Sequence, residues 1–162
     1  MTTDPRRSVD SDAVRLRPMR IADLDVLLAY EQAMFGTEAW SRRSYLDELA
    51  DTEFRYYLVA ESPTGEVLGD GGLMTIGETA QILTVGVVPQ HRRAGVGKLL
   101  VRGLIAEAVR RKATEVLLEV RVDNNGARRL YESEGFDALG IRRGYYDHGR
   151  VDAVTMRLNL QP

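Results

Sequence analysis

The sequence predicts a single α/β domain with a mixed, mostly antiparallel central sheet flanked by helices. Two observations support this fold class. Short runs rich in branched and aromatic residues alternate along the chain with longer segments whose apolar residues recur at helical spacing. The 162 residues, 44% of them hydrophobic, are also the right amount of chain for one core. We place the domain at residues 13–160 and expect the polar residues 1–12 to form a flexible tail.

The expected elements follow one another in a regular order. From residue 13 onward we expect a strand, two helices and three strands of an antiparallel meander, at 13–17, 23–36, from Ser41, 54–60, 67–76 and 81–88. The remaining chain predicts a long helix, a strand, a short helix and two final strands, at 96–112, 115–122, 127–134, 138–141 and 153–160. Asp23 is the expected cap of the first helix. The turn before the long helix lies at a carboxyl-terminal strand edge, where ligands bind in open α/β sheets.

This turn joins the strand that ends at Val88 to the long helix, and it combines glycines with cations. Glycine lets the backbone come close to a ligand, and the free N–H groups at a helix start bind anions. Arginine and lysine side chains add positive charge. The turn therefore predicts a phosphate site, and its residues are Arg92, Arg93, Ala94, Gly95, Val96, Gly97 and Lys98.

Three phosphate-binding patterns are candidates, and two of them fail. A nucleotide P-loop requires glycine where Arg92 stands and a hydroxyl where Leu99 stands. The dinucleotide fingerprint requires glycine where Leu100 stands, and an acidic residue closing a strand about 20 residues further on. Residues 92–97 meet the third pattern, Gln/Arg-x-x-Gly-x-Gly/Ala after a strand, which resembles the coenzyme A pyrophosphate loop of the GNAT superfamily of N-acetyltransferases. A basic surface turn that caps a helix remains the alternative.

Composition limits the classes of function. A net charge of −2 gives no overall basic excess for nucleic acid or an acidic membrane surface. The absence of cysteine excludes thiolate catalysis and cysteine-based zinc sites, and two histidines are too few for a histidine-rich metal centre. No apolar run approaches the ~20 residues of a membrane span, and residues 1–12 lack the apolar core of a signal peptide. We therefore expect a cytoplasmic protein that binds no metal, nucleic acid or membrane.

The strand at 115–122 carries an acid, Glu119, among apolar neighbours. Strand alternation places Leu118 and Val120 on one face, and Glu119 and Arg121 on the other. If part of the second face lines a cleft, Glu119 is placed to act as a general base. A salt bridge to an arginine at a strand edge is the alternative.

The segment that follows this strand has a distinctive sequence. Taken singly, Asn124 is typical of a helix cap, and Leu130, Tyr131 and Phe136 are typical of a core. The complete run reads Leu-Glu-Val-Arg, then Asn-x-x-Ala, then Leu-Tyr-Glu-x-x-Gly-Phe. It closely resembles the ribosomal-protein-alanine N-acetyltransferases, the RimI group of the GNAT superfamily.

The resemblance extends to an Arg-Arg-x-Tyr-Tyr segment, an Asp-Ala-x-x-Met strand and a Trp-Ser pair, at 142–146, 152–156 and 40–41. It spans about residues 14–158 and implies the GNAT fold. Two departures stand out: Ala39 replaces the usual proline, and Arg92 replaces the commoner glutamine. The implied activity is transfer of an acetyl group from acetyl-CoA to a protein N-terminal α-amine, with a ribosomal protein as one possible acceptor.

The resemblance also implies roles for single residues. Glu119 would take a proton from the acceptor amine, and Tyr131 would protonate the departing coenzyme A thiolate. Trp40, Tyr145 and Tyr146 would wall the acceptor groove, with core packing as the alternative for each. Coenzyme binding is implied for a strand edge, the phosphate turn and the later strand-to-helix junction, at Val85, Gly86, Val87, Arg92, Arg93, Ala94, Gly95, Val96, Gly97, Lys98 and Asn124.

Two other functions remain open. An enzyme of the same fold could acetylate lysine, a polyamine or an aminoglycoside, although polycationic substrates favour an acidic cleft and four arginines lie near the expected site, at 128, 129, 142 and 143. A non-catalytic acyl-coenzyme A sensor would need neither Glu119 nor Tyr131. The preferred acceptor sequence and the oligomeric state are not determined by the sequence.

Overall fold

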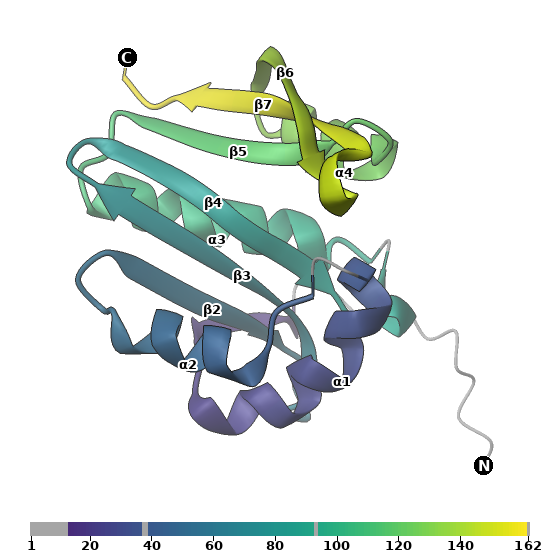
Figure 1. Ribbon diagram of the computed structural model, residues 1–162. Helices are drawn as coiled ribbons and strands as arrows, with labels where there is room; N and C mark the ends of the chain where they lie inside the picture. The colour runs from purple at the N-terminus through teal and green to yellow at the C-terminus, as the bar shows by residue number, and fades with distance from the viewer. Residues whose placement is uncertain (1–12, 37–38, 93, 162) are drawn as a thin grey trace.

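The computed structural model describes residues 13–36, 39–92 and 94–161 (Figure 1). One seven-stranded sheet runs through it in the order β1-β2-β3-β4-β5-β7-β6, with α1 and α2 on one face and α3 on the other. Neighbouring strands are antiparallel except β4 and β5, which are parallel. The predicted mixed, mostly antiparallel sheet is confirmed. The expected tail at 1–12 lies outside the described residues.

The elements are short and evenly spaced along the chain. The strands are β1 (Arg15–Pro18), β2 (Arg55–Glu61), β3 (Val67–Ile76), β4 (Thr79–Val87), β5 (Glu115–Arg121), β6 (Asp137–Tyr146) and β7 (Val151–Asn159). The α-helices are α1 (Leu24–Phe35), α2 (Arg42–Ala50), α3 (Val96–Arg110) and α4 (Asn125–Ser133). Short 3-10 turns precede α1, follow β4 and join β6 to β7, at Ile21–Asp23, Pro89–His91 and Asp147–Gly149.

Two sequence predictions about these elements were wrong. β6 runs over Asp137–Tyr146 instead of 138–141, because it is an edge strand whose exposed backbone tolerates polar residues on both faces. Asp23 stands at the N-cap position of α1, but its side chain makes no capping hydrogen bond, because its carboxylate is bound by the guanidinium of Arg17, at 2.7 and 2.8 Å, and by the N–H of Arg20. Ser41, by contrast, does cap α2, since its hydroxyl accepts the N–H of Ser44.

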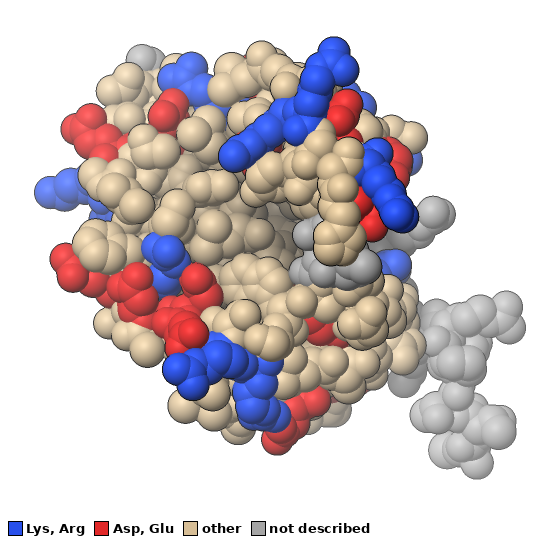
Figure 2. All heavy atoms as spheres, in the orientation of Figure 1, with Lys and Arg blue, Asp and Glu red and all other residues tan. Residues whose placement is uncertain are grey.

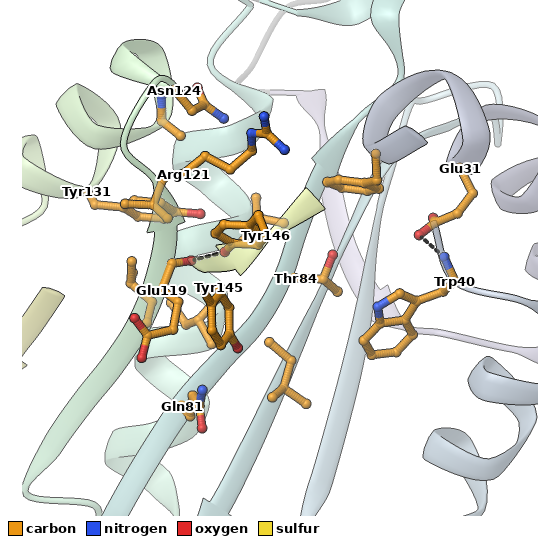
Figure 3. Close-up of a pocket in the computed structure, with 17 residues that line it drawn as sticks. Glu31, Trp40, Gln81, Thr84, Glu119, Arg121, Asn124, Tyr131, Tyr145 and Tyr146 are labelled. Carbon is orange, nitrogen blue, oxygen red and sulfur yellow. Dashed lines mark hydrogen bonds between the residues drawn. The ribbon is translucent and has the colours of Figure 1, made fainter. Parts of the chain in front are cut away.

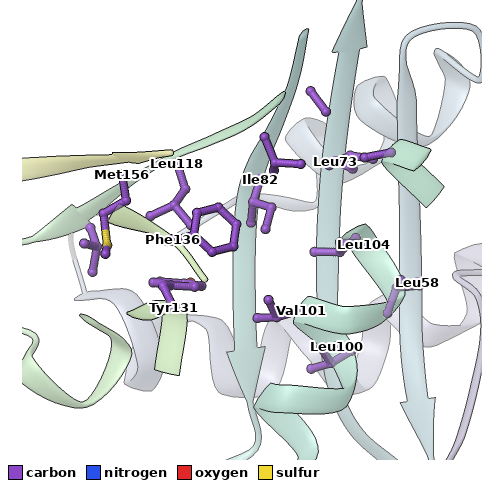
Figure 4. Packing of buried hydrophobic residues seen from close by; sticks show 14 of the residues in the cluster. Leu58, Leu73, Ile82, Leu100, Val101, Leu104, Leu118, Tyr131, Phe136 and Met156 are labelled. Carbon is purple, nitrogen blue, oxygen red and sulfur yellow. The ribbon is translucent and has the colours of Figure 1, made fainter. Parts of the chain in front are cut away.

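Hydrophobic side chains fill both faces of the sheet. On one face the apolar stripe of α3, including Leu100 and Leu104, packs on strand residues such as Leu73 and Leu118 (Figure 4). On the other face α1 and α2 cover a smaller cluster. Its fully buried side chains include Tyr45. The predicted role of α3 as a cover for the sheet is confirmed.

The feature that positions the site is the separation of β4 from β5. The two strands pair only from Thr79 to Gln81, opposite Glu115 to Leu117, although each continues beyond this ladder. In the β3–β4 ladder, Gly72 is opposite Thr84 and Leu73 is opposite Ile82, so β4 bulges between them. A bulge bends its strand and increases the local twist. An opening therefore forms in the middle of the sheet while β5 stays paired with β7.

The buried position of Leu104 predicts a large effect of truncation. Leu104→Ala should lower the free energy of unfolding by about 2–5 kcal/mol, because a cavity remains in the packed core. Chemical denaturation followed by circular dichroism measures this change. The control is Leu139→Ala, whose residue is 59% exposed and should change stability by less than about 0.5 kcal/mol. Equal losses in the two variants would contradict the assigned core.

Candidate active site

A cleft of about 690 Å³ lies where β4 and β5 separate. Figure 2 shows it as a hollow between the two halves of the sheet. One wall carries Glu31 and Trp40, and the opposite wall is built by β5, the start of α4 and the end of β6 (Figure 3). The cleft brings together seven of the residues singled out from the sequence, Trp40, Val85, Glu119, Asn124, Tyr131, Tyr145 and Tyr146.

Glu119 lines the cleft from the face of β5 that the alternation predicted. Its side chain is 11% exposed. One carboxylate oxygen accepts the hydroxyl of Thr155, its partner on β7, at 2.6 Å. The other lies 3.5 Å from the guanidinium of Arg142, which is 59% exposed and therefore well screened by water. The sequence left two alternatives open for Glu119, a position in a cleft and an arginine partner, and the structure shows both at once.

Tyr131 belongs to the core and to the cleft at once. Its residue is 8% exposed, and its ring packs edge-on against Phe136 with centroids 5.8 Å apart. Burial raises the pKa of the Tyr131 hydroxyl to about 12. The phenol therefore keeps its proton throughout the physiological pH range and is able to donate it.

The remaining cleft aromatics hold the two walls in shape. The hydroxyl of Tyr146 donates to the carbonyl oxygen of Glu119 at 3.1 Å, which ties the end of β6 to β5 (Figure 3). Tyr145 packs against Tyr146 and carries the guanidinium of Arg142 4.6 Å above its ring. On the opposite wall, the ring of Trp40 lies among other aromatic rings and its main-chain N–H is bound by Glu31.

Asn124 sits where β5 leads into α4. Its side-chain oxygen accepts the N–H of Ala127 at 3.1 Å, so it caps the helix, as the simpler interpretation of the sequence predicted. The same residue borders the cleft. Asn124 is therefore both the cap of α4 and a residue of the cleft lining.

The edge of β4 and the turn after it provide main-chain donors. Beyond Gln81, β4 makes no ladder with β5 among the described residues, and Val85 lines the cleft, whereas Gly86 and Val87 lie outside its lining. Gly95 precedes α3 with φ of +81°, a conformation that favours glycine, and no side chain among the residues that the structure describes caps the helix. The first N–H groups of α3 are therefore free to bind an anion.

The cations of this turn differ in their surroundings. Arg92 is exposed, and its Nε donates to the carbonyl of Val87 at 3.4 Å. Lys98 is exposed and lies 3.6 Å from Glu134, the residue that follows helix α4. Arg93 lies outside the described residues. The turn thus keeps Arg92 and Lys98 near the start of α3 without burying either charge.

A group of buried polar residues behind one wall of the cleft was missed from the sequence. Glu31, Tyr45 and Asp70 are buried side by side under the Trp40 wall. The sequence did contain a signal for Glu31. It follows Leu24 by seven, Leu27 by four and Leu28 by three positions, so helical spacing places it on the apolar face of α1. Asp70 stands inside an apolar, glycine-rich strand. An acid at an apolar position is a sign of a buried partner.

The described part of the chain was searched for a metal-binding cluster and for a membrane-spanning helix. In these residues no group of three or more His, Cys, Asp or Glu side chains is arranged to hold a metal ion. Nor does any helix within them have the length and apolar character needed to cross a membrane.

Comparison with known proteins identifies the class of enzyme to which this fold belongs. Residues 24–136 match the sequence profile of the Acetyltransferase (GNAT) family, and the chain belongs to that family. It is an N-acetyltransferase, and its family takes the acetyl group from acetyl-CoA.

Individual relatives point to the RimI group predicted from the sequence. The chain is 33% identical to the N-alpha-acetyltransferase RimI of Mycobacterium tuberculosis over 155 residues, which cover 93% of this chain and 95% of the relative. It is 31% identical to the ribosomal protein bS18-alanine N-acetyltransferase of Escherichia coli over 123 residues, 75% of this chain and 81% of the relative. The crystal structure of the Escherichia coli ribosomal-protein-S18-alanine N-acetyltransferase matches with a TM-score of 0.81 and 28% identity, covering 92% of this chain and 95% of that one.

The buried acid Asp70 predicts how stability depends on pH. Burial raises its pKa to about 7 from the ordinary value of 3.8, and burial also raises the pKa of Glu31. The folded state then holds a proton that the unfolded chain has already lost, so stability falls as the pH rises through this window. We expect the stability of Asp70→Asn relative to the wild type to rise between about pH 4 and pH 7, the interval between the two pKa values, and to level off above it. Urea denaturation at several pH values measures the difference, and a difference independent of pH would contradict the assignment.

Proposed function

We propose that this protein transfers the acetyl group of acetyl-CoA to the N-terminal α-amine of a protein. One observation carries the proposal: a carboxylate, Glu119, and a protonated phenol, Tyr131, line the same cleft at the open end of β4. By analogy with the RimI relatives, whose names state a ribosomal protein alanine as the acceptor, we propose a ribosomal protein as substrate. We further propose that the enzyme acts in the cytoplasm.

The coenzyme would bind along β4 and at the start of α3. Main-chain groups of Val85, Gly86 and Val87 are suited to pair with the amides of the pantetheine arm, as an added strand would. The free N–H groups of α3 are suited to the pyrophosphate, with Arg92 and Lys98 adding positive charge. Arg93, Ala94, Gly95, Val96 and Gly97 complete the proposed loop, and Asn124 would contact the coenzyme nearer the cleft.

The reaction would proceed by direct attack. The amine nitrogen bonds to the thioester carbon, the carbon–sulfur bond breaks, and the amine proton passes to Glu119 directly or through water. Tyr131 gives its proton to the departing sulfur, and solvent exchange restores both residues. An α-amine has an ordinary pKa of about 7.7–8.0, against about 10.4 for lysine, so more of it is neutral at physiological pH. A carboxylate is a sufficient base for such an acceptor.

The groups around Glu119 support this role. Thr155 fixes one of its carboxylate oxygens, while the exposed Arg142 is free to move away from the other when a substrate enters. Trp40, Tyr145 and Tyr146 would form the walls of the acceptor groove, since all three border the cleft. Each of these rings also packs against other aromatic side chains.

The proposed acceptor predicts which amine is modified. Peptides with a free α-amine should be acetylated at that amine, and peptides with a blocked α-amine and free lysine should not react. Incubation with acetyl-CoA followed by tandem mass spectrometry locates the acetyl group. A panel varied at the first residue, with alanine included, gives the preference. Acetylation confined to lysine side chains or to small amines would overturn the N-terminal assignment.

The proposed acid and base predict a specific kinetic change. Glu119→Gln and Tyr131→Phe should each lower kcat about 100-fold or more and leave the KM for acetyl-CoA nearly unchanged. Glu115→Gln is the matched control for the first, because Glu115 lies on the same face of β5, outside the cleft. Tyr56→Phe, on β2, is the control for the second. If the site variants retain the turnover of their controls, the assigned roles are wrong.

A further inference from the structure

A buried chain of three polar side chains leads from the sheet to the cleft wall. Asp70 of β3, Tyr45 of α2 and Glu31 of α1 are at most 2% exposed. The hydroxyl of Tyr45 lies 3.1 Å from Asp70 Oδ2 and 2.9 Å from Glu31 Oε2. Glu31 Oε1 accepts the main-chain N–H of Trp40 at 2.9 Å. The chain thus connects the middle of β3 to the residue that walls the cleft opposite Glu119.

The number of protons shared by the hydrogen-bonded side chains of Asp70, Tyr45 and Glu31 limits how they can be arranged. A tyrosine hydroxyl has one proton and can donate to only one of the two carboxyl groups. With both acids ionised, one buried carboxylate oxygen would face the tyrosine oxygen without a proton between them, which is costly. A proton on Asp70 removes the conflict, because Asp70 then donates to Tyr45, and Tyr45 donates to Glu31.

The surroundings of Asp70 favour this arrangement. Its second oxygen, Oδ1, is buried and accepts no hydrogen bond from the described residues, so little stabilises a negative charge there. The titratable groups that face Asp70 are Glu31 from α1, Tyr45 from α2 and Tyr57 from β2. The hydroxyl of Tyr57 is already bound by Glu48. The proton that Asp70 keeps thus leaves Glu31 free to act as a carboxylate.

Trp40 is held both by its indole ring and by its main chain. Its indole ring lies 5.2 Å from the ring of Tyr45 and 5.9 Å from the ring of Tyr57. Its main chain is held by Glu31. Gly72 makes room for the ring of Tyr57, since a Cβ at this position would come within 2.3 Å of the Tyr57 ring. A change in Tyr45 or Glu31 therefore acts on both the ring and the backbone of Trp40.

We propose that Glu31 is a positioning residue for the acceptor: bound through Tyr45 to Asp70, it fixes Trp40 and thereby the cleft wall that faces Glu119. The assignment of this wall to the acceptor rests on the proposed function. Glu31 itself does not touch the reacting atoms. When Asp70 loses its proton, Tyr45 has two ionised partners for one proton, the bond to Glu31 weakens, and Trp40 is held less firmly.

Trp40 is the only tryptophan of the chain, so its fluorescence reports this wall directly. The wild-type protein should show a change in emission with a midpoint near pH 7, and Asp70→Asn should abolish it, because an amide donates to Tyr45 at every pH. Glu31→Gln should alter the emission below the midpoint. The control Glu48→Gln, which removes a carboxylate bound to a different tyrosine, should keep the transition. An unchanged emission in the wild type, or a transition that survives in Asp70→Asn, would overturn the proposal.

The same variants test the effect on the acceptor. Glu31→Gln should raise the KM for the acceptor peptide about three- to tenfold and leave kcat and the KM for acetyl-CoA within about twofold. Circular dichroism confirms that the variant is folded, and Glu48→Gln again serves as the control. If the wild type acetylates no α-amine, the proposed function fails while the fluorescence test stands. If the wild type is active and Glu31→Gln leaves the acceptor KM unchanged, the positioning role alone is wrong.

Discussion

The short parallel ladder between β4 and β5 is the constraint on which the rest of the structure depends. It holds the two halves of the sheet together from Thr79 to Gln81 and then ends, because a bulge bends β4 away while β5 remains paired with β7. Every group of the candidate site is placed by this opening. Residues of β4 from Gln81 to Val85 and of β5 from Leu118 to Arg121 line the same cleft, and α3 begins a short way after the end of β4.

The two walls of the cleft are held by different kinds of interaction. On the β5 side, Glu119 has a hydroxyl partner on β7 and a screened arginine, so its carboxylate is oriented but stays accessible. On the α1 side, Glu31 is deeply buried and accepts hydrogen bonds from the hydroxyl of Tyr45 and the main-chain N–H of Trp40. The first arrangement suits a residue that exchanges protons with a substrate. The second suits a residue that holds a wall in place.

Local patterns in the sequence were enough for most of the fold. The apolar stripe of α3 and the alternation along β5 depend on periodicity alone, and both are confirmed. β6 was predicted too short, because an exposed edge strand lacks the apolar pattern that marks a strand. Asp23 was assigned to a helix cap, but Arg17, which lies near it only in the folded chain, binds its carboxylate instead.

By itself the sequence determined the family, the place of the glycine-rich turn and the face of β5 that carries Glu119, because motifs and alternation are local properties of the chain. Only the tertiary structure decided which of these residues share a cleft, since β4 and β5 part at a bulge that no short motif encodes. The tertiary structure also decided the burial and the hydrogen-bond partners of Glu31 and Asp70. Their burial and their shared tyrosine arise where α1, α2 and β3 meet, and the proton balance of buried acids depends on neighbours distant in sequence.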